Sequence, residues 1–276
     1  MIITRTPTRI SFLGGGTDYP EYFLEHGGAV LATSIDKYCY VGLRNGKSWV
    51  LYDIPSRSGM GTSSAYTVGL LKACSHYDNR TIAQIATIIE RDKLAGNVGF
   101  QDQYMCAVGG FKLLQFSPSG IAEKEIADVD WLNDYLLLFD TSRYRSAGTI
   151  VSSQLERVEL NLPILDKLKE MVYTGEDLLN QKDYRGFGKL LDEAWTLKKS
   201  LAGNVSNEFI DSIYSKAIQM GAIGGKLLGA GGGGFIMFLA ELERHEDIKK
   251  ELRLFHVPFK FEKWGSQIIY ADKGGE

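Results

Sequence analysis

Three glycine clusters, set among hydroxyl and acidic side chains, have the residue types needed to bind and transfer a phosphate group. Glycine accounts for 31 of the 276 residues, above the usual share of about 7%, and the excess gathers at residues 14–16, 59–61 and 229–234. Glycine-rich backbone can take positive φ angles and approach another group closely. A loop that surrounds a phosphate with its N–H groups needs both properties.

The strongest local signal lies at residues 55–65, where two glycines precede three hydroxyl side chains. Small and apolar residues then follow at helical spacing, which predicts a helix that begins at Thr62 or Ser63. The positive end of such a helix favours an anion, and a hydroxyl could cap the helix or reach a phosphate-bound Mg²⁺. An ordinary loop with a serine N-cap accounts for the same residues, so the pattern alone leaves both interpretations open.

The third cluster contains a formal G-x-G-x-x-G match at residues 229–234. That fingerprint requires a helix after the glycines, whereas residues 235–239 have a strand pattern, which disfavours a dinucleotide site. A Walker A motif is also excluded, because Lys226 precedes Leu227 rather than Ser or Thr. This tract is expected to pack against a second loop or a ligand.

Three acidic residues could act on a phosphate held by these loops. Asp18 directly follows the first glycine cluster, Glu90 lies on the flank of an expected helix, and Asp102 stands between polar neighbours. A carboxylate beside a bound phosphate can hold Mg²⁺ or take a hydroxyl proton during transfer. The alternative for each acid is a solvated surface charge. Arg143 and Arg145 form a fork suited to a sugar phosphate, and a solvated loop explains them equally well.

The composition limits the classes of partner and the location. Lys and Arg total 31 against 34 Asp and Glu, a net charge of -3, which argues against a nucleic-acid surface. No apolar run approaches the roughly 20 residues that span a bilayer, and the N-terminus lacks a secretory pattern, so we expect a cytoplasmic protein without membrane or nucleic-acid partners. The three cysteines are expected in the core, and no Cys or His spacing indicates a transition-metal site.

The helices and strands that we expect to position these residues make the chain an α+β protein. We place a boundary near residues 128–133, between a glycine-rich, strand-rich domain at 1–130 and a more helical domain at 131–276. In the helix expected at 81–93, Thr81 is the predicted N-cap. Strands are expected at 9–13, 29–43, 111–116, 135–139, 235–239 and 267–270, and further helices at 101–106, 152–168, 174–195, 209–220 and 246–252.

Three motifs in this order resemble those of the GHMP kinase superfamily, and the resemblance covers most of the chain. They occupy residues 9–19, 55–65 and 226–234. Within the superfamily, the Gly-Gly-Gly-Thr-Asp-Tyr turn, the Arg-Ser-Gly-Met-Gly loop and the segments 97–104 and 195–199 are similar to those of D-glycero-D-manno-heptose 7-phosphate kinases. That group makes heptose 1,7-bisphosphate for surface polysaccharides.

The resemblance implies an N-terminal domain like ribosomal protein S5 domain 2, a C-terminal ferredoxin-like domain and an active site between them. It implies ATP and Mg²⁺ as cofactors and a sugar phosphate as the partner, with a homodimer left open. The expected reaction is transfer of the ATP γ-phosphoryl group to the anomeric hydroxyl of the heptose. The alternatives are a kinase for another sugar, such as fucose, and a catalytically silent sugar sensor on the same scaffold.

Carried over position by position, the resemblance also implies roles for residues of this chain. Asp102 and Arg9 would be catalytic, and Ser63 and Glu90 would hold Mg²⁺. The tract at 229–234 would support the loop at residues 55–65, called the phosphate loop, more than touch ATP. The residues expected around ATP are Pro55, Ser58, Gly59, Met60, Gly61, Thr62, Ser63 and Ser64, and those expected around the sugar are Gly15, Gly16, Thr17, Asp18, Arg143, Arg145, Gly231 and Gly232.

One stretch departs from the family pattern. Only 36 residues, 19–54, separate Asp18 from Pro55, and relatives carry extra strands and part of the adenine pocket there. Either the protein has a natural deletion or a longer natural chain carries a further segment between Asn45 and Pro55. We favour the longer chain, because loss of a nucleotide-pocket element would leave the remaining motifs without purpose. An intact mass near 30.7 kDa would establish the deletion.

Overall fold

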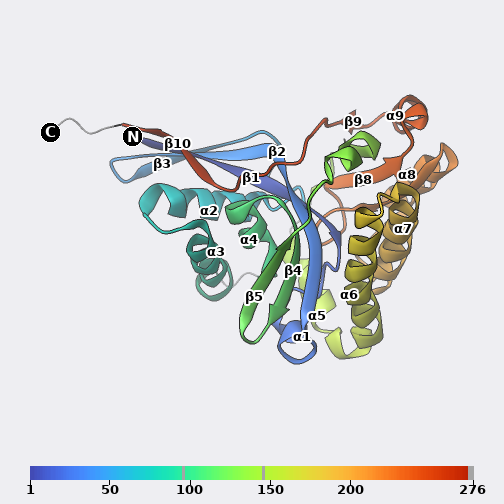
Figure 1. Cartoon of the computed structure of the whole chain (residues 1–276), viewed down its shortest axis with the longest axis horizontal. Coiled ribbons are helices and arrows are strands. Elements are labelled where there is room, and N and C mark those ends of the chain that lie inside the picture. The colour runs from blue at the N-terminus through green and yellow to red at the C-terminus, as the bar shows by residue number, and fades with distance from the viewer. Residues whose placement is uncertain (95–96, 145–146, 273–276) are drawn as a thin grey trace.

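The computed structural model describes residues 1–94, 97–144 and 147–272, which form two antiparallel sheets with helices packed against them (Figure 1). The first sheet has six strands in the order β10-β1-β2-β4-β5, with β3 paired to β2, and the second has four in the order β7-β8-β6-β9. The strands are β1 (Ile2–Leu13), β2 (Gly28–Arg44), β3 (Lys47–Tyr52), β4 (Phe111–Ser117), β5 (Gly120–Glu125), β6 (Leu136–Asp140), β7 (Ala222–Leu227), β8 (Phe235–Ala240), β9 (Phe255–His256) and β10 (Gln267–Ala271).

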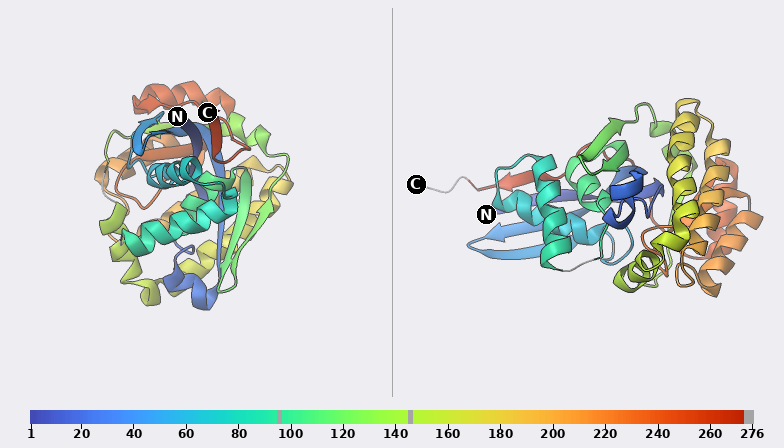
Figure 2. Two further views of the ribbon diagram at one scale, coloured as in Figure 1. Left: turned by 90° about the vertical axis from the view of Figure 1, so that its left-hand side faces the viewer. Right: turned by 90° about the horizontal axis from the view of Figure 1, so that it is seen from below.

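Two groups of helices lie at opposite ends of the molecule, with α1 between them (Figure 2). Helices α2, α3 and α4 cover one face of the first sheet, and α6, α7 and α8 lie at the far end with the second sheet. Their bounds are α1 (Pro20–His26), α2 (Thr62–Cys74), α3 (Asn79–Ile88), α4 (Gln101–Val108), α5 (Ala147–Leu155), α6 (Val158–Asn180), α7 (Tyr184–Ser200), α8 (Glu208–Gln219) and α9 (His245–Leu252), with a π-helical turn at Ile89–Lys93 and 3₁₀ turns at Asp130–Tyr135 and Leu242–Arg244.

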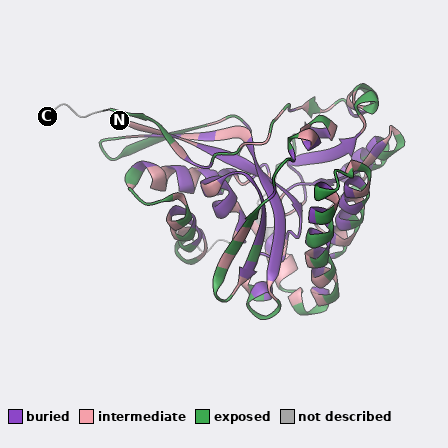
Figure 3. Ribbon diagram, in the orientation of Figure 1, coloured by how far each residue is buried: buried purple, intermediate pink, exposed green. Residues whose placement is uncertain are grey.

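Strands β1 and β2 form the centre of the molecule and are buried over most of their length (Figure 3). Both are longer than the expected 9–13 and 29–43. Helix α2 crosses them closely because Gly69 has no side chain: a Cβ there would lie 2.9 Å from Thr6 Oγ1. The Thr4 hydroxyl then donates to the Gly69 carbonyl at 2.9 Å. This packing fixes the start of α2 relative to the end of β1.

One apolar core joins the two groups of elements. The ring of Phe12, near the end of β1, stacks on Phe111 of β4 with centroids 5.2 Å apart and meets Phe187 of α7 edge-on at 5.7 Å. All three residues belong to one buried cluster that contains residues from both sheets. Strand β10, from the far end of the chain, pairs with β1. The division at residue 130 therefore stays a prediction.

The short stretch before the phosphate loop folds as a closed hairpin. Strand β3 pairs antiparallel with β2, with Arg44 opposite Lys47. The two residues between them, Asn45 and Gly46, have φ angles of 50° and 72°, as required by the two-residue turn that best matches strand twist. The chain then runs through Tyr52 towards the phosphate loop.

Three helix predictions are wrong in part. The helix expected at 81–93 begins at Asn79, because Asp78 and not Thr81 caps it: the Asp78 carboxylate accepts from the N–H groups of Arg80 and Thr81 at 2.9 and 3.1 Å. The helix expected at 152–168 is divided between α5 and α6. The helix expected at 174–195 is divided between α6 and α7, since Lys182 takes a φ of 57° and Asp183 caps the second segment.

The remaining expectations about the chain as a whole have mixed outcomes. The helix predicted to begin at Thr62 or Ser63 does begin at Thr62, and the mixed α and β class is confirmed. Cys39 and Cys106 are buried, whereas Cys74 is exposed at the end of α2, so that core prediction was wrong. Over the described residues, no helix is long and apolar enough to cross a membrane.

Candidate active site

A cavity of about 580 Å³ opens where the end of β1, the N-terminus of α2 and the second sheet meet. It is lined by the first glycine turn, the phosphate loop and residues from α4, α5, α7 and β7. The lining includes Arg9, Ser11, Gly15, Gly16, Asp18, Tyr52, Gly59, Gly61, Thr62, Ser63, Ser64, Tyr66, Glu90, Gly99, Asp102, Gln154, Lys198, Lys226 and Gly229.

Arg9 and Asp102 form a two-bond ion pair at the edge of this cavity. Arg9 Nε and Nη2 donate to the two carboxylate oxygens of Asp102, each at 2.7 Å, and Nη1 donates to the Gly59 carbonyl at 2.6 Å. Burial lowers the pKa of the guanidinium, but the charge and hydrogen bonds of Asp102 outweigh it, so the pKa of Arg9 is raised. Its side chain is 5% exposed and that of Asp102 28%. The arginine thus holds an accessible carboxylate beside the phosphate loop.

The first glycine turn places Asp18 in the cavity wall. Its carboxylate accepts from the N–H groups of Gly16 and Gln101 at 3.2 and 3.3 Å. Gly99 permits this position, because a Cβ there would lie 2.0 Å from Asp18 Oδ2. Burial raises the pKa of Asp18, and the nearby charge of Asp102 adds to the effect. Gly15, Gly16 and Asp18 line the cavity as expected, whereas Thr17 does not: its buried hydroxyl donates to backbone carbonyls.

The loop at residues 56–64 leads into the N-terminus of α2 and contributes several residues to the cavity wall. Gly59 and Gly61 have φ angles of 79° and 72°, and no side chain caps the N-terminus of α2. The first N–H groups of a helix need a partner, and an anion is a suitable one. Of the residues expected around ATP, five line the cavity: Gly59, Gly61, Thr62, Ser63 and Ser64. Pro55, Ser58 and Met60 lie outside the lining, and the last two are buried.

The third glycine tract packs against this loop, backbone on backbone. A Cβ on Gly59 would lie 2.6 Å from the Leu228 carbonyl oxygen, and one on Gly234 would lie 2.3 Å from that of Ser58. This is the contact expected of a supporting tract. Gly231 and Gly232 lie outside the cavity lining and pack on Val205, whose carbonyl accepts from Gly232 N–H at 2.9 Å. Their expected contact with the sugar stays a prediction.

Glu90 is buried and held by three donors. Ser64 donates at 2.8 Å and Gln103 Nε2 at 2.5 Å to Oε2, and Thr67 donates at 2.7 Å to Oε1. Burial raises the pKa of Glu90 despite these bonds. The neighbouring Ser63 hydroxyl also lines the cavity, without a bond to Glu90. No cluster of three or more His, Cys, Asp or Glu residues that could hold a metal occurs in the part of the chain that the structure describes.

Arg143 and Arg145, the two arginines of the expected fork, differ in what the structure describes of them. Arg143 is exposed, lies outside the cavity lining, and holds its guanidinium carbon 3.8 Å from the ring centroid of Phe209. Arg145 falls outside the described residues. Their proposed contact with a remote phosphate stays a prediction, which fails if replacement of both by alanine leaves the KM for the sugar phosphate unchanged.

The sequence interpretation missed several lining residues. Lys198 and Lys226 face the cavity from α7 and β7, and Tyr52 and Tyr66 lie in the wall near the phosphate loop. Lys198 belongs to the buried face of α7, and a lysine on an otherwise apolar helix face was the available signal. The tyrosines follow no recognisable motif, since only the hairpin and α2 together bring them to one wall.

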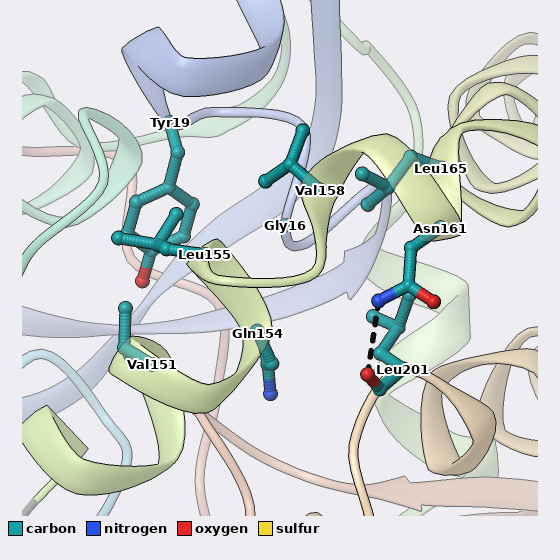
Figure 4. A pocket seen from close by; sticks show the side chains of 9 residues that line it. All are labelled: Gly16, Tyr19, Val151, Gln154, Leu155, Val158, Asn161, Leu165 and Leu201. Atoms are coloured by element: carbon teal, nitrogen blue, oxygen red, sulfur yellow. Dashed lines mark hydrogen bonds between the residues drawn. The ribbon is translucent and has the colours of Figure 1, made fainter.

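A small apolar recess adjoins the cavity beneath α5 (Figure 4). Gly16, Tyr19, Val151 and Gln154 line both spaces. Gln154 Nε2 donates to the Ala230 carbonyl at 3.1 Å, which connects α5 to the third glycine tract. The recess is otherwise lined by Leu155, Val158, Asn161, Leu165 and Leu201.

Comparison with known proteins gives matches over both halves of the chain. Residues 30–110 match the family described as GHMP kinases N terminal domain, and residues 176–257 match GHMP kinases C terminal. A D-glycero-alpha-D-manno-heptose 7-phosphate kinase from Campylobacter jejuni is 28% identical over 315 residues, covering 91% of this chain and 93% of that protein. This match spans more positions than the chain has residues, so that relative contains segments that this chain lacks.

Two further similarities bear on fold and substrate. The L-fucokinase/L-fucose-1-P guanylyltransferase of Bacteroides fragilis is 30% identical over 211 residues, covering 70% of this chain and 22% of that longer protein. The crystal structure of a D-glycero-D-manno-heptose 1-phosphate kinase from Bacteroides thetaiotaomicron superposes with a TM-score of 0.78 at 23% identity, covering 98% of this chain and all of that one. At that identity the superposition establishes the fold alone.

Proposed function

Because this chain belongs to the GHMP kinases and has their two-part α+β fold, we propose that it phosphorylates D-glycero-D-manno-heptose 7-phosphate. The γ-phosphoryl group of ATP is transferred to the anomeric hydroxyl, which gives the 1,7-bisphosphate and ADP. The reaction class, phosphoryl transfer from ATP to a small molecule, follows from the family. The heptose phosphate as acceptor is supported by the similarity to the Campylobacter enzyme.

The position of the Arg9–Asp102 pair carries this proposal. The pair lies between the phosphate loop and the first glycine turn, the two parts of the cavity that suit the two substrates. Arg9 donates to the Gly59 carbonyl of the loop, and the charge of Asp102 raises the pKa of Asp18 in the turn. A sugar hydroxyl that reaches Asp102 from the Asp18 side would face a phosphoryl group held at the N-terminus of α2. This arrangement suits in-line transfer, which depends mainly on positioning and charge stabilisation.

Asp102 is proposed to receive the hydroxyl proton or to orient the hydroxyl. Arg9 holds the carboxylate in place through its two hydrogen bonds, and its charge offsets negative charge that develops on the transferring group. Asp18, bonded to two backbone N–H groups, is proposed to accept hydrogen bonds from sugar hydroxyls. The amides of the phosphate loop and of the first turn of α2 would bind the ATP phosphates.

The donor set beside the loop fits Mg²⁺ bound together with a nucleotide. Mg²⁺ is usually held by one or two carboxylates plus substrate phosphates and water, and here Glu90 and Ser63 would supply the protein oxygens. Three donors already occupy the Glu90 carboxylate, which leaves about one of its four lone-pair sites. Bound there, the ion would neutralise charge on the ATP phosphates.

We expect Glu90→Gln to raise the Mg²⁺ concentration for half-maximal activity roughly 10- to 100-fold. The neutral amide is a weaker ligand, and the remaining contacts of the residue are to protein groups. Thermal stability at pH 7 is expected to be maintained, since burial raises the pKa of Glu90 and disfavours its charge in the folded state. Because the pKa of Glu90 is raised in the folded state, ionisation of Glu90 lowers the free energy of unfolding as the pH rises from the unfolded pKa to the folded pKa. The neutral amide removes this destabilisation.

Glu21→Gln is the matched control for the magnesium titration. Glu21 is accessible and pairs with Arg91 at 2.7 Å on the adjacent surface, and such exposed pairs contribute little stability. The control should keep the wild-type Mg²⁺ dependence. An unchanged dependence in Glu90→Gln would remove Glu90 from the metal site.

A coupled ADP-release assay across sugars, with and without a phosphate group, tests the proposed substrate. We expect the highest kcat/KM with the heptose 7-phosphate. A higher value with fucose would support the alternative suggested by the fucokinase relative. Absence of turnover with all sugars, together with measurable sugar binding, would support the silent sensor instead.

A further inference from the structure

Two buried lysines face the cavity, and the proposed roles above use neither of them. Lys198 of α7 is 8% exposed and Lys226 of β7 is 3% exposed, and both belong to the cavity lining. Lys198 Nζ donates to the Gly229 carbonyl and Lys226 Nζ to the Phe12 carbonyl, each at 2.7 Å. An ammonium carries three donors, so one recorded bond leaves two on each lysine.

Neither ammonium has a negative partner of its own. Among the residues that the structure describes, no carboxylate lies within the 4.0 Å ion-pair distance of Lys198 or Lys226, in contrast to Arg9. Burying a cation costs several kcal/mol unless an anion and hydrogen bonds compensate it. The two lysines are therefore placed where a negatively charged ligand would relieve that cost.

A third polar group converges on the same part of the wall. Ser11 is 6% exposed, lines the cavity, and has an Oγ without a hydrogen-bond partner among the described residues. The point where a Cβ would stand on Gly15 lies 3.5 Å from Lys198 Nζ and 3.6 Å from Ser11 Oγ. Since glycine leaves that point empty, an ammonium and a free hydroxyl border the same small space.

We propose that Lys198, Lys226 and Ser11 form an anion subsite that binds a phosphate group in the wall of the cavity. The proposal rests on the proposed kinase function for the origin of that group, which is the sugar's own phosphate or the phosphoryl group in transfer. Both carry several negatively charged oxygens that accept hydrogen bonds. The charges of Asp18, Arg9 and Asp102 all shift the pKa of Lys198, so the subsite lies close to the reacting groups.

The free protein should bind the anion in a pH-dependent way. Burial lowers the pKa of Lys198 to about 8; Asp18 and Asp102 oppose this effect, and Arg9 adds to it. Burial, and then the charges of Lys198 and Arg9, lower the pKa of Lys226 well below its usual value. The lysines lose charge as the pH rises, so phosphate affinity should fall through about pH 8. Bound phosphate should in turn raise the pKa of Lys198.

Calorimetric titration with inorganic phosphate at pH 7 tests the subsite without any kinase turnover. Wild-type protein is expected to bind phosphate, and Lys198→Met to bind it roughly 10- to 100-fold more weakly, as for loss of a charged hydrogen bond. Lys199→Met is the matched control, because Lys199 is on the same helix but pairs with Asp211 outside the cavity lining. Equal affinity in wild type and Lys198→Met, or no binding by wild type, would overturn the subsite.

A measurement on wild-type protein tests the subsite even if the Lys198→Met variant does not fold. In ¹⁵N-lysine NMR, one buried ammonium should titrate near pH 8, and phosphate should move that midpoint upward. Ser11→Ala, which removes no charge, should weaken phosphate binding several-fold. A midpoint that phosphate leaves in place would contradict the proposal.

Kinetics with Lys198→Met then identify which phosphate the subsite holds. If it binds the sugar's own phosphate, KM should rise for the heptose 7-phosphate and stay constant for the unphosphorylated heptose. If it binds the phosphoryl group in transfer, kcat should fall equally for both sugars. No change with either would exclude the subsite from the reaction. Phosphate binding by a protein without kinase activity would refute the proposed function alone.

Discussion

Replacing Asp102 with asparagine is expected to lower kcat roughly 10²- to 10⁴-fold. The amide cannot accept a proton, and it offers one acceptor oxygen to Arg9 in place of two. Because Arg9 is buried, the lost bond should also lower the free energy of unfolding by about 1–3 kcal/mol. Steady-state kinetics at saturating ATP and sugar give kcat, and thermal melting confirms that the variant is folded.

The control for this variant is Asp92→Asn. Asp92 is exposed on the π-helical turn and lies outside the cavity lining, so its replacement should leave kcat and stability near wild type. ATP binding by Asp102→Asn should also persist, since the phosphate loop is intact. Turnover close to wild type in Asp102→Asn would overturn the role proposed for Asp102.

Replacing Gly59 with alanine is expected to separate the phosphate loop from the third glycine tract. The new Cβ would lie 2.6 Å from the Leu228 carbonyl oxygen, and the position has a φ of 79°. The unfavourable φ costs about 1–2 kcal/mol and the clash with backbone about 1–3 kcal/mol. We therefore expect a loss of about 2–5 kcal/mol in the free energy of unfolding and a large rise in the KM for ATP.

Gly46→Ala separates the two contributions to that loss. Gly46 has nearly the same φ, 72°, but a Cβ there has nothing within 4 Å. Urea unfolding of Gly46→Ala should show only the conformational cost of about 1–2 kcal/mol, with unchanged ATP kinetics. Equal stability losses and normal ATP binding in both variants would refute the support of the loop by the third tract.

The turn and the helix start at residues 59–64 could be predicted from the sequence because their signal is local. The glycines and hydroxyls at residues 59–64 specify both the turn and the helix start, and α2 begins where expected. The glycine tract at residues 229–234 predicted packing against a second loop or a ligand, and only the family resemblance implied that this partner is the phosphate loop. The buried strands β6 and β8 followed from continuous apolar runs.

The environment of Glu90 could not be predicted because the buried face of its helix lies elsewhere than expected. The sequence leaves Glu90 on the flank of the helix, whereas the buried residues of α3 include Ala86 and Thr87. Glu90 follows them by four and three residues on that buried side, within a π-helical turn, and accepts from Ser64, Thr67 and Gln103. Such turns are rare, and they occur often at functional sites.

Lys198 and Lys226 escaped prediction for a different reason. Lysine is almost never fully buried, so an isolated lysine in a sequence is taken as a surface charge. Only the packing of α7 and β7 against the end of β1 places both ammonium groups in the cavity, where they bond to the carbonyls of Gly229 and Phe12.

Phosphorus NMR of one reaction mixture tests the central claim most directly. With ATP, Mg²⁺ and D-glycero-D-manno-heptose 7-phosphate, we expect the γ-phosphate signal to disappear while a new anomeric sugar phosphate signal appears beside the retained 7-phosphate. The same mixture with Asp102→Asn should show neither change on that time scale. Persistent ATP and a single sugar phosphate signal, with protein that binds both substrates, would contradict the assignment of this cavity as a heptose phosphate kinase site.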